Sequence, residues 1–315
     1  MRALGRMGGA RSPAGDGRVR AKGGGGGGGM SVADAFASYP APDMAWREAL
    51  PTEMLTIPHA DATREFFYRE ITSAVAACLA AGHTRVAARC WIPELNPTMD
   101  VYSAKTVLTA VRYVATEFSS RGRVKVLVQP SLGKGFWMGM PLSLNGMKRL
   151  LETMDWGPGV LGNTVKVGSI DESEVDANDT LYLLIAPQSI TGGDVTPRLL
   201  AFTEAAEAAG KPVVLFNPKL GDIPSAEGVM GPRGRAERQA FWATFVEAYH
   251  FRLFFPSGGF FPIRGCLRRC FPFNYEVNQY QMRGELGRGG AAWKLLSDKF
   301  ETEPSRVQIT KCFTG

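Results

Sequence analysis

A glycine-rich loop is the segment of this sequence that comes nearest to a site for phosphate chemistry. It reads Gly133-Lys134-Gly135-Phe136-Trp137-Met138-Gly139. Glycines let backbone N–H groups surround a phosphate, and a lysine adds positive charge. A P-loop, however, needs glycine where Val128 stands and serine or threonine where Gly135 stands. The Rossmann spacing is missed by one residue at Gly139. The alternative is a turn that lets the loop's apolar residues pack.

Other catalytic and metal-binding patterns are missing from the sequence. It contains neither the Gly-x-Ser-x-Gly elbow of α/β-hydrolases nor a His-Glu-x-x-His zinc motif. Five scattered cysteines include no Cys-x-x-Cys pair, so we expect reduced thiols, with a redox pair at Cys266 and Cys270 as the alternative. With three histidines in the chain, we expect no metal, no cofactor and no catalytic constellation.

A second set of candidate residues follows the predicted strands. Five of these strands end at a proline, which removes an N–H donor and stops a strand; the pairs are Ile92-Pro93, Gln129-Pro130, Ala186-Pro187, Asn217-Pro218 and Phe255-Pro256. If the strands are parallel, these ends share one edge, where open α/β sheets bind ligands. The polar residues there are Glu94, Asn96, Asp100, Gln129, Ser131, Gln188, Asn217, Lys219 and Ser257, with Gly133, Lys134 and Gly135 beside them. The alternative role for these residues is loop capping.

Aromatic and arginine residues alternate late in the chain and predict a partner surface. The set is Phe260, Phe261, Arg264, Arg268, Arg269, Phe271, Phe273 and Tyr275. Aromatic residues and arginine are enriched in the cores of protein interfaces. The arginines would also favour an anionic membrane surface. The alternative is a half-buried strand whose arginine stems lie along its rim.

The elements that position these residues alternate between strand and helix. Helices are predicted from Asp61 to Gly82, from Asp100 or Ser103, from Ser143 or Asn145 to about Trp156, and over Thr196–Ala209 and Arg235–Ala248. Strands are predicted over Thr84–Ile92, Val124–Val128, Val165–Ile170, Leu181–Ala186, Val213–Phe216 and His250–Phe255. This alternation predicts an α/β fold with a mostly parallel, Rossmann-like, three-layer sheet.

The tail has a different pattern and predicts an antiparallel C-terminal hairpin. Tyr275–Gln281 pairs in this prediction with Trp293–Phe300 across a glycine-rich turn at Gly284–Gly290. The alternative is a short helix over Ala291–Phe300. Val307–Phe313 then forms either an extra strand or a closing helix.

Charge is concentrated at the start of the 315-residue chain. The first 29 residues hold six basic residues and one acidic residue, so they carry +5 of the net charge of +6. The body is nearly neutral, which argues against nucleic-acid binding. This arginine-rich leader resembles an organelle transit peptide, unless the chain starts at Met30 or the leader is a disordered arm. The glycine run Gly23–Gly29 is expected to be flexible. We expect residues 1–45 to be leader and linker and residues 46–315 to be one α/β domain.

Several segments resemble, in order, a plastid and cyanobacterial family with a domain of unknown function. This family includes the third Low-PSII-Accumulation protein. The first match is Ile92-Pro93-Glu94-Leu95-Asn96-Pro97-Thr98-Met99-Asp100-Val101-Tyr102. The others are Gly139-Met140-Pro141-Leu142, Met154-Asp155-Trp156-Gly157, Ala186-Pro187-Gln188, Phe216-Asn217-Pro218-Lys219-Leu220, and Tyr249–Phe255 followed by Pro262-Ile263-x-Gly265-x-Leu267-Arg268.

The resemblance implies a chloroplast protein of the stroma or the stromal face of the thylakoid. It implies help in photosystem II assembly, with photosystem core or antenna subunits and other assembly factors as partners and with peripheral thylakoid association. We therefore expect a non-catalytic accessory protein that binds a photosystem. One alternative is a stromal enzyme or sensor that binds a nucleotide or phosphorylated metabolite at the strand ends. The other is a resident peripheral subunit of a photosystem supercomplex.

Overall fold

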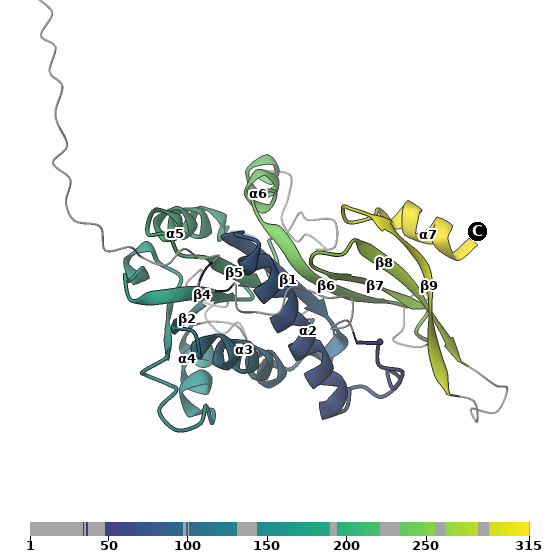
Figure 1. Ribbon diagram of the computed structural model, residues 1–315, viewed down its shortest axis with the longest axis horizontal. Coiled ribbons are helices and arrows are strands. Elements are labelled where there is room, and N and C mark those ends of the chain that lie inside the picture. The colour runs from purple at the N-terminus through teal and green to yellow at the C-terminus, as the bar shows by residue number, and fades with distance from the viewer. Residues whose placement is uncertain are drawn as a thin grey trace, which may run out of the picture. The chain divides into compact units, whose positions relative to one another are not determined.

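A nine-stranded sheet is the frame of the computed structural model (Figure 1). The structure describes residues 34, 36, 48–96, 99, 101–130, 144–189, 194–220, 234–255, 262–282 and 290–314. These residues lie in one compact unit, Ser31–Gly315. The strand order is β3-β2-β4-β5-β1-β6-β7-β8-β9.

Six neighbouring strands form the parallel part of the sheet. They are β1 (Arg85–Trp91), β2 (Arg123–Val128), β3 (Val165–Ser169), β4 (Asp179–Ile185), β5 (Val213–Phe216) and β6 (Val246–Phe254). Their burial on both faces is what a parallel sheet covered by helices requires. In β4, Leu181, Leu183 and Ile185 face one hydrophobic core, whereas Tyr182 and Leu184 face the other.

Three antiparallel strands extend the sheet beyond β6. They are β7 (Gly265–Cys270), β8 (Tyr275–Met282) and β9 (Ala291–Phe300). The predicted α/β fold with antiparallel strands at the C-terminus is confirmed, and Ala291–Phe300 is a strand and not a short helix. β7 lies in the aromatic and arginine segment, for which a half-buried strand was the alternative prediction.

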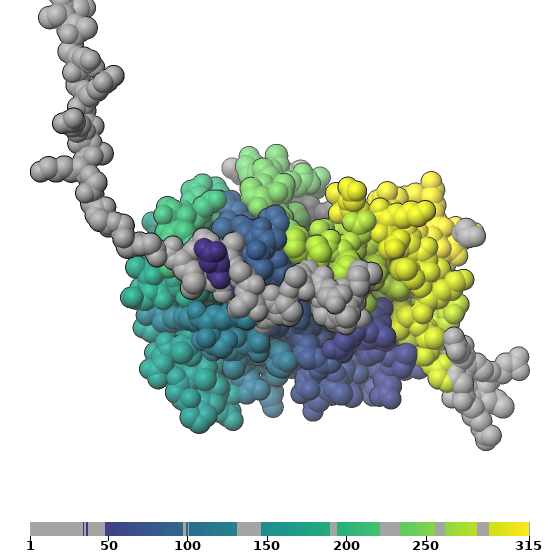
Figure 2. Space-filling view, in the orientation of Figure 1, coloured from purple at the N-terminus to yellow at the C-terminus, as the bar shows by residue number. Residues whose placement is uncertain are grey.

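Helices cover the two faces of the sheet. α2 (Asp61–Ala80), α3 (Ala104–Ser119) and α4 (Leu144–Thr153) pack on one face, and α5 (Thr196–Ala208) and α6 (Arg235–Trp242) pack on the other (Figure 1). Short 3-10 turns, η2 (Pro93–Leu95) and η4 (Glu172–Glu174), follow β1 and β3. Figure 2 shows one side of the molecule, with β9 and α7 (Arg306–Thr314) in yellow at one end and the segments around α4 in teal at the other.

Two predicted boundaries need correction. The helix expected over Arg235–Ala248 ends at Trp242, and β6 begins at Val246, four residues before the predicted start. A β-bulge in the pairing with β1 places both Glu247 and His250 opposite residues of one face, and this irregular spacing hid the strand from a test of alternation. At the other end of the body, Phe36 is buried against Phe118 of α3, so a residue assigned to the leader and linker belongs to the core.

The structure tests the possible redox pair and the possibility of a membrane-spanning helix. Cys266 and Cys270 are both buried on β7. Four residues along a strand separate their Cα atoms by about 13 Å, too far for a disulfide, which needs less than about 7 Å. Within the described ranges, no helix is long and apolar enough to cross a membrane.

Candidate functional site

Five adjacent parallel strands end at one edge of the sheet, called here the carboxyl edge. They are β2, β4, β5, β1 and β6 in spatial order, and the second residue after each of them is a proline. The prediction that the proline-terminated strands share an edge is confirmed.

The chain changes direction between β2 and β4. After β2 it continues through α4 to the outer strand β3, whereas after β4 it continues through α5 in the opposite direction along the sheet to β5. α4 and α5 consequently lie on opposite faces. Open α/β sheets bind ligands outside the carboxyl ends of strands at such a switch point. The arrangement makes this part of the carboxyl edge a candidate site.

Gln129 and Gln188 lie on the two sides of the switch point and bind each other. The side-chain Nε2 of Gln129 donates to the backbone oxygen of Gln188 at 3.1 Å. The side-chain Oε1 of Gln129 accepts from the backbone N–H of Gln188 at 2.6 Å. Both polar ends of the Gln129 side chain are thus used to join the ends of β2 and β4.

Asn217 makes a similar connection between β5 and β1. Its Oδ1 accepts from the backbone N–H of Cys90 at 2.6 Å, and its Nδ2 donates to the backbone oxygens of Cys90 at 3.0 Å and Leu95 at 3.3 Å. The side chain is buried. Lys219, two residues later, forms a parallel bridge with Gln188, which prolongs the pairing of the two chain segments beyond their prolines.

Glu94 forms a buried pair with His59 at the end of β1. Its carboxylate accepts from the backbone N–H of His59 at 3.0 Å and lies 2.9 Å from the ring Nδ1. Burial raises the pKa of this carboxyl, but the hydrogen bonds and charge of His59 outweigh it, so the net pKa is lowered. The other ring nitrogen, Nε2, is buried and has no hydrogen-bond partner among the residues described. The Glu94 carboxylate thus fixes the orientation of the buried imidazole ring.

The backbone is strained at two of the strand ends. Ala186 has a φ of +39° and Asn217 a φ of +46°, and each stands directly before a proline. Residues other than glycine rarely adopt the left-handed region, and a following proline restricts the backbone further. Because β4 and β5 are neighbours, the two strained residues lie side by side. Such strain clusters at functional sites.

The remaining residues of the predicted ligand edge are placed only in part. Asn96 follows η2, where its backbone N–H donates to the oxygen of Pro93 at 3.2 Å. Asp100, Ser131, Gly133, Lys134, Gly135 and Ser257 lie outside the described residues. The structure therefore brings Glu94, Asn217, Gln188 and Lys219 to one edge, as expected.

The predicted partner surface is divided between two edges of the sheet. Arg264 precedes β7 at the carboxyl edge and is exposed, whereas Phe271 and Phe273 follow β7 at the opposite edge. Six residues of strand separate these positions by about 20 Å. The ring of Phe271 packs on that of His83, with centroids 5.5 Å apart. Phe260 and Phe261 are outside the part of the chain that the structure describes.

The other residues of that predicted surface are turned toward the protein. Arg268 is 4% exposed and bonds to Glu70 of α2, whose carboxylate also accepts from Tyr249 at 3.0 Å. Tyr275 is 3% exposed, and the guanidinium of Arg269 lies over its ring at 4.8 Å. Among the residues of this set that the structure describes, Arg264, Arg269, Phe271 and Phe273 retain accessible area for a partner.

A buried ionic cluster lies on the opposite face of the sheet, near α6. Nη2 of Arg89 bonds to Glu247 and Glu303, both at 2.7 Å, and Tyr275 donates to Glu247 as well. Burial raises the pKa of the Glu247 carboxyl, but the charges of Arg89 and His250 bring it well below its usual range. Burial lowers the pKa of His250, against the opposing effect of Glu247.

This cluster does not fit a metal ion. Glu247, His250 and Glu303 each offer a ligand atom within 4.8 Å of the others. Two carboxylates and an imidazole are a donor set that transition metals accept. Here, however, the guanidinium of Arg89 already binds both carboxylates, and the half-buried Arg252 interacts with the same two charges. A divalent ion would add its charge beside these two arginines, so the cluster is better described as an ion network of the protein.

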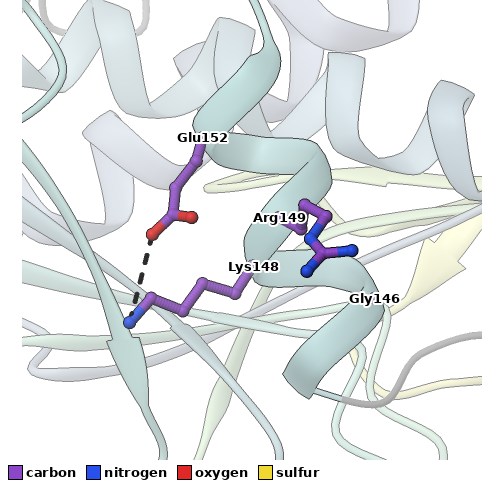
Figure 3. A pocket seen from close by; sticks show the side chains of 4 residues that line it. All are labelled: Gly146, Lys148, Arg149 and Glu152. Atoms are coloured by element: carbon purple, nitrogen blue, oxygen red, sulfur yellow. Dashed lines mark ion pairs between the residues drawn. The ribbon is translucent and has the colours of Figure 1, made fainter.

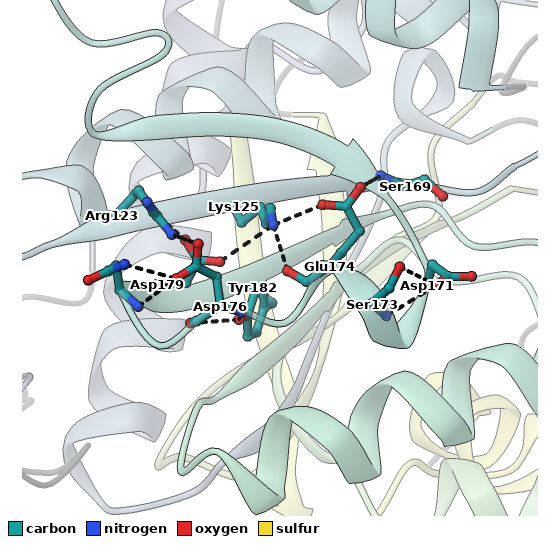
Figure 4. A network of polar contacts seen from close by, with 10 residues as sticks. Arg123, Lys125, Ser169, Asp171, Ser173, Glu174, Asp176, Asp179 and Tyr182 are labelled. Atoms are coloured by element: carbon teal, nitrogen blue, oxygen red, sulfur yellow. Dashed lines mark hydrogen bonds and ion pairs between the residues drawn. The ribbon is translucent and has the colours of Figure 1, made fainter.

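A second ionic network holds the β3–β4 connection against the sheet (Figure 4). Nζ of Lys125 lies 2.8 Å from the Glu174 carboxylate, and Arg123 bridges Asp176 at 2.6 Å and Asp179. The hydroxyl of Tyr182 accepts from the backbone N–H of Asp176 at 2.8 Å. Each of these charged side chains pairs with another residue of the network, which indicates a structural role.

Sequence analysis missed several members of the two buried polar clusters, namely His59, Arg89, Glu247 and Glu303. A charged residue inside the apolar run of β1 was the one signal available, because Arg89 interrupts Val86, Ala87, Ala88 and Cys90. Its partners stand 158 and 214 residues later. His59 stands 35 residues before Glu94 in an irregular segment, so spacing gives no signal for that pair.

Comparison with known proteins identifies a family but no relative of known structure. The model of the family described as Domain of unknown function (DUF1995) matches residues 62–311. The match covers β1 to β9 and all the polar clusters described above except His59. No solved structure matches this chain.

Proposed function

The chain belongs to the DUF1995 family, and we propose that it is a non-catalytic accessory protein that binds a photosystem. The proposed target is photosystem II during assembly or stabilisation, at the stromal face of the thylakoid in a chloroplast. Its partners are photosystem core or antenna subunits and other assembly factors.

One observation favours a binding role over catalysis. At the carboxyl edge, Glu94, Gln129 and Asn217 use their polar atoms within the protein, on His59 and on backbone groups of neighbouring strands. Buried polar side chains bonded in this way stabilise an edge, and a substrate would have to break these bonds. Glu94, Gln129 and Asn217 therefore serve the fold first.

The identity of the partner rests on sequence. The ordered segments from Ile92 to Arg268 resemble the family of the third Low-PSII-Accumulation protein, and the arginine-rich leader resembles a transit peptide. Both features support a chloroplast protein that acts on photosystem II.

Native gel electrophoresis of solubilised thylakoids, probed for this chain, tests the proposal. We expect the chain to migrate with photosystem assembly intermediates. Migration with the mature supercomplex would identify a resident peripheral subunit instead. Detection solely as a free stromal monomer would contradict both.

A second candidate function is binding of a nucleotide or phosphorylated metabolite at the carboxyl edge. The strained residues Ala186 and Asn217 at the ends of neighbouring strands, close to the switch point, favour it. A thermal-shift screen with nucleotides and sugar phosphates tests this function. A ligand present at 100 times its dissociation constant stabilises the fold by about 2.7 kcal/mol. A screen without any shift would contradict it.

A further inference from the structure

A groove between α3 and α4 is the strongest unassigned feature of the described surface. Its volume is about 380 Å³, and it is lined by Lys105, Leu108 and Arg112 of α3 and by Leu150, Thr153 and Met154 at α4. A second hollow of about 510 Å³ adjoins α4 at Gly146, Lys148, Arg149 and Glu152 (Figure 3).

The floor of the groove is apolar and one of its walls is exposed. α4 turns Met147 and Leu151 fully into the core, whereas Leu150 is 46% exposed. Leu108 is buried below it, and Met154 is half-buried. A leucine that is held at a concave surface and partly open to water provides an anchor for an apolar side chain of a partner.

The rim of the groove is basic. Lys105 and Arg112 stand seven residues apart on α3, which places them two turns, or about 10 Å, apart along the groove. Asp155 supplies one negative charge to this groove, whereas Lys148, Arg149 and Glu152 of α4 line the second hollow. Figure 3 shows Lys148 extending toward Glu152, at 4.0 Å, while Arg149 projects from another side of the helix.

The bonds of these charged groups leave the rim positive. Arg112 donates to the backbone oxygen of Asp155, which does not neutralise its charge. The carboxylate of Asp155 accepts from the backbone N–H of Gly157 at 2.9 Å. The apolar floor of the groove is thus flanked by two cations, Lys105 and Arg112, and by one carboxylate, Asp155.

We propose that this groove binds an acidic amphipathic helix of a partner protein. An apolar floor about two turns long accepts side chains at the i, i+3 or i+4, and i+7 positions of a helix. The basic rim complements acidic residues on the flanks of that helix. A flat bilayer would contact the rim before it reached a floor set below it, so the shape favours a helix. This inference rests on the proposed binding function and names the surface that would perform it.

The test measures fluorescence anisotropy of a labelled helical peptide of about four turns. The peptide has leucine at the i, i+4 and i+7 positions and glutamate at most others, and a control peptide has lysine in place of glutamate. We expect the acidic peptide to bind the full chain, more weakly as salt is raised, and the lysine peptide not to bind.

Matched variants locate the binding. Leu150→Asp and Lys105→Glu should each weaken binding of the acidic peptide about tenfold or more. Val307→Asp and Lys311→Glu, which make the same changes on exposed positions of α7, should leave it unchanged. Equal binding by all four variants, or by the lysine peptide, would overturn the proposal. Circular dichroism confirms that each variant is folded.

Two further outcomes separate the possible failures. The first outcome is that the chain binds no peptide but sediments with phosphatidylcholine vesicles that contain phosphatidylglycerol, and that Leu150→Asp abolishes this sedimentation. This result would assign the groove to a membrane and overturn the proposal of a helical partner. The second outcome is that Leu150→Asp is found with photosystem complexes at wild-type levels. This result would contradict the proposed role of the groove and leave the proposed function standing. Absence of the wild-type chain from those complexes would contradict the proposed function itself.

Discussion

Glu94 and His59 connect the segment before α2 to the end of β1 through a pair that is shielded from water. We predict that Glu94→Gln lowers the free energy of unfolding by about 1–3 kcal/mol. The reason is that the backbone N–H and the ring Nδ1 of His59 stay buried while the side chain they contact loses its negative charge. Urea unfolding measures this loss. Asp61→Asn, which breaks the exposed ion pair with Arg64, is the control and should cost less than about 0.5 kcal/mol. Equal effects of the two substitutions would contradict the structural role of the Glu94 pair.

His250 makes stability depend on pH. The pKa of His250 and that of Glu247 are both lowered in the folded chain. For His250 the cause is burial. For Glu247 burial raises the pKa, but the charges of Arg89 and His250 outweigh it. The unfolded chain therefore binds more protons at these sites, and acid favours unfolding. The loss begins below a pH of about 6.5 for the histidine and continues below about 4.3 for the glutamate.

The variant His250→Gln isolates the first of these steps. It cannot titrate, so its urea midpoint should fall less between pH 7.5 and pH 5.5 than that of the wild type. An identical fall in both proteins would show that His250 is not protonated on unfolding in this range.

Single residues were the least predictable part of the site. The sequence placed Glu94, Gln188, Asn217 and Lys219 at one edge, because strand ends marked by proline can be found without a structure. It did not reveal their partners, since hydrogen bonds such as that between Asn217 and Cys90 join residues 127 positions apart. The buried position of Arg268 was also hidden, because its partner Glu70 lies on a helix 198 residues earlier.

The ends of β4 and β5 are strained elements, and this strain can be measured. Ala186→Gly should raise the free energy of unfolding by up to about 1 kcal/mol, because left-handed backbone costs alanine about 1–2 kcal/mol and glycine loses about 0.5–1 kcal/mol through chain entropy. Ala243→Gly, at a φ of −63°, is the control and should destabilise the chain by about 0.5–1 kcal/mol. A loss of stability in Ala186→Gly would show that the strain is absent.

Close packing of β7, β8 and α7 depends on a glycine. A Cβ at Gly265 would lie 2.3 Å from the backbone oxygen of Asn278 and 2.7 Å from the ring of Phe313. Gly265→Ala should therefore separate these elements and cost about 1–3 kcal/mol in a thermal or urea unfolding experiment. Gly290→Ala, with nothing within 4 Å, is the matched control and should be neutral. A neutral Gly265→Ala would contradict the described contact of α7 with the sheet.

Elements were predicted better than residues. Val213–Phe216 agrees with β5 at both ends, and the helix expected over Thr196–Ala209 is α5 to within one residue. Periodicity sufficed where each face of an element meets one core. It failed at β6, where a bulge carries Glu247 and His250 to the same face, and it left the form of Val307–Phe313, which lies within α7, undecided.

At the scale of the whole molecule, the described polar residues of the carboxyl edge differ from those of the groove between α3 and α4. Glu94, Gln129 and Asn217 make their polar contacts within the chain, whereas Leu150 and Lys105 at the groove are exposed. That distribution fits a protein that works by attachment to a partner. The identity of that partner cannot follow from the fold, because one α/β architecture serves many functions.

The most direct test of the proposed binding function is affinity purification of the chain from solubilised thylakoids, with mass spectrometry of the proteins that accompany it. We predict photosystem subunits in near-stoichiometric amounts, retained by Val307→Asp and depleted by Leu150→Asp. A monomer that brings no thylakoid protein with it would contradict the proposal and favour a small ligand at the carboxyl edge.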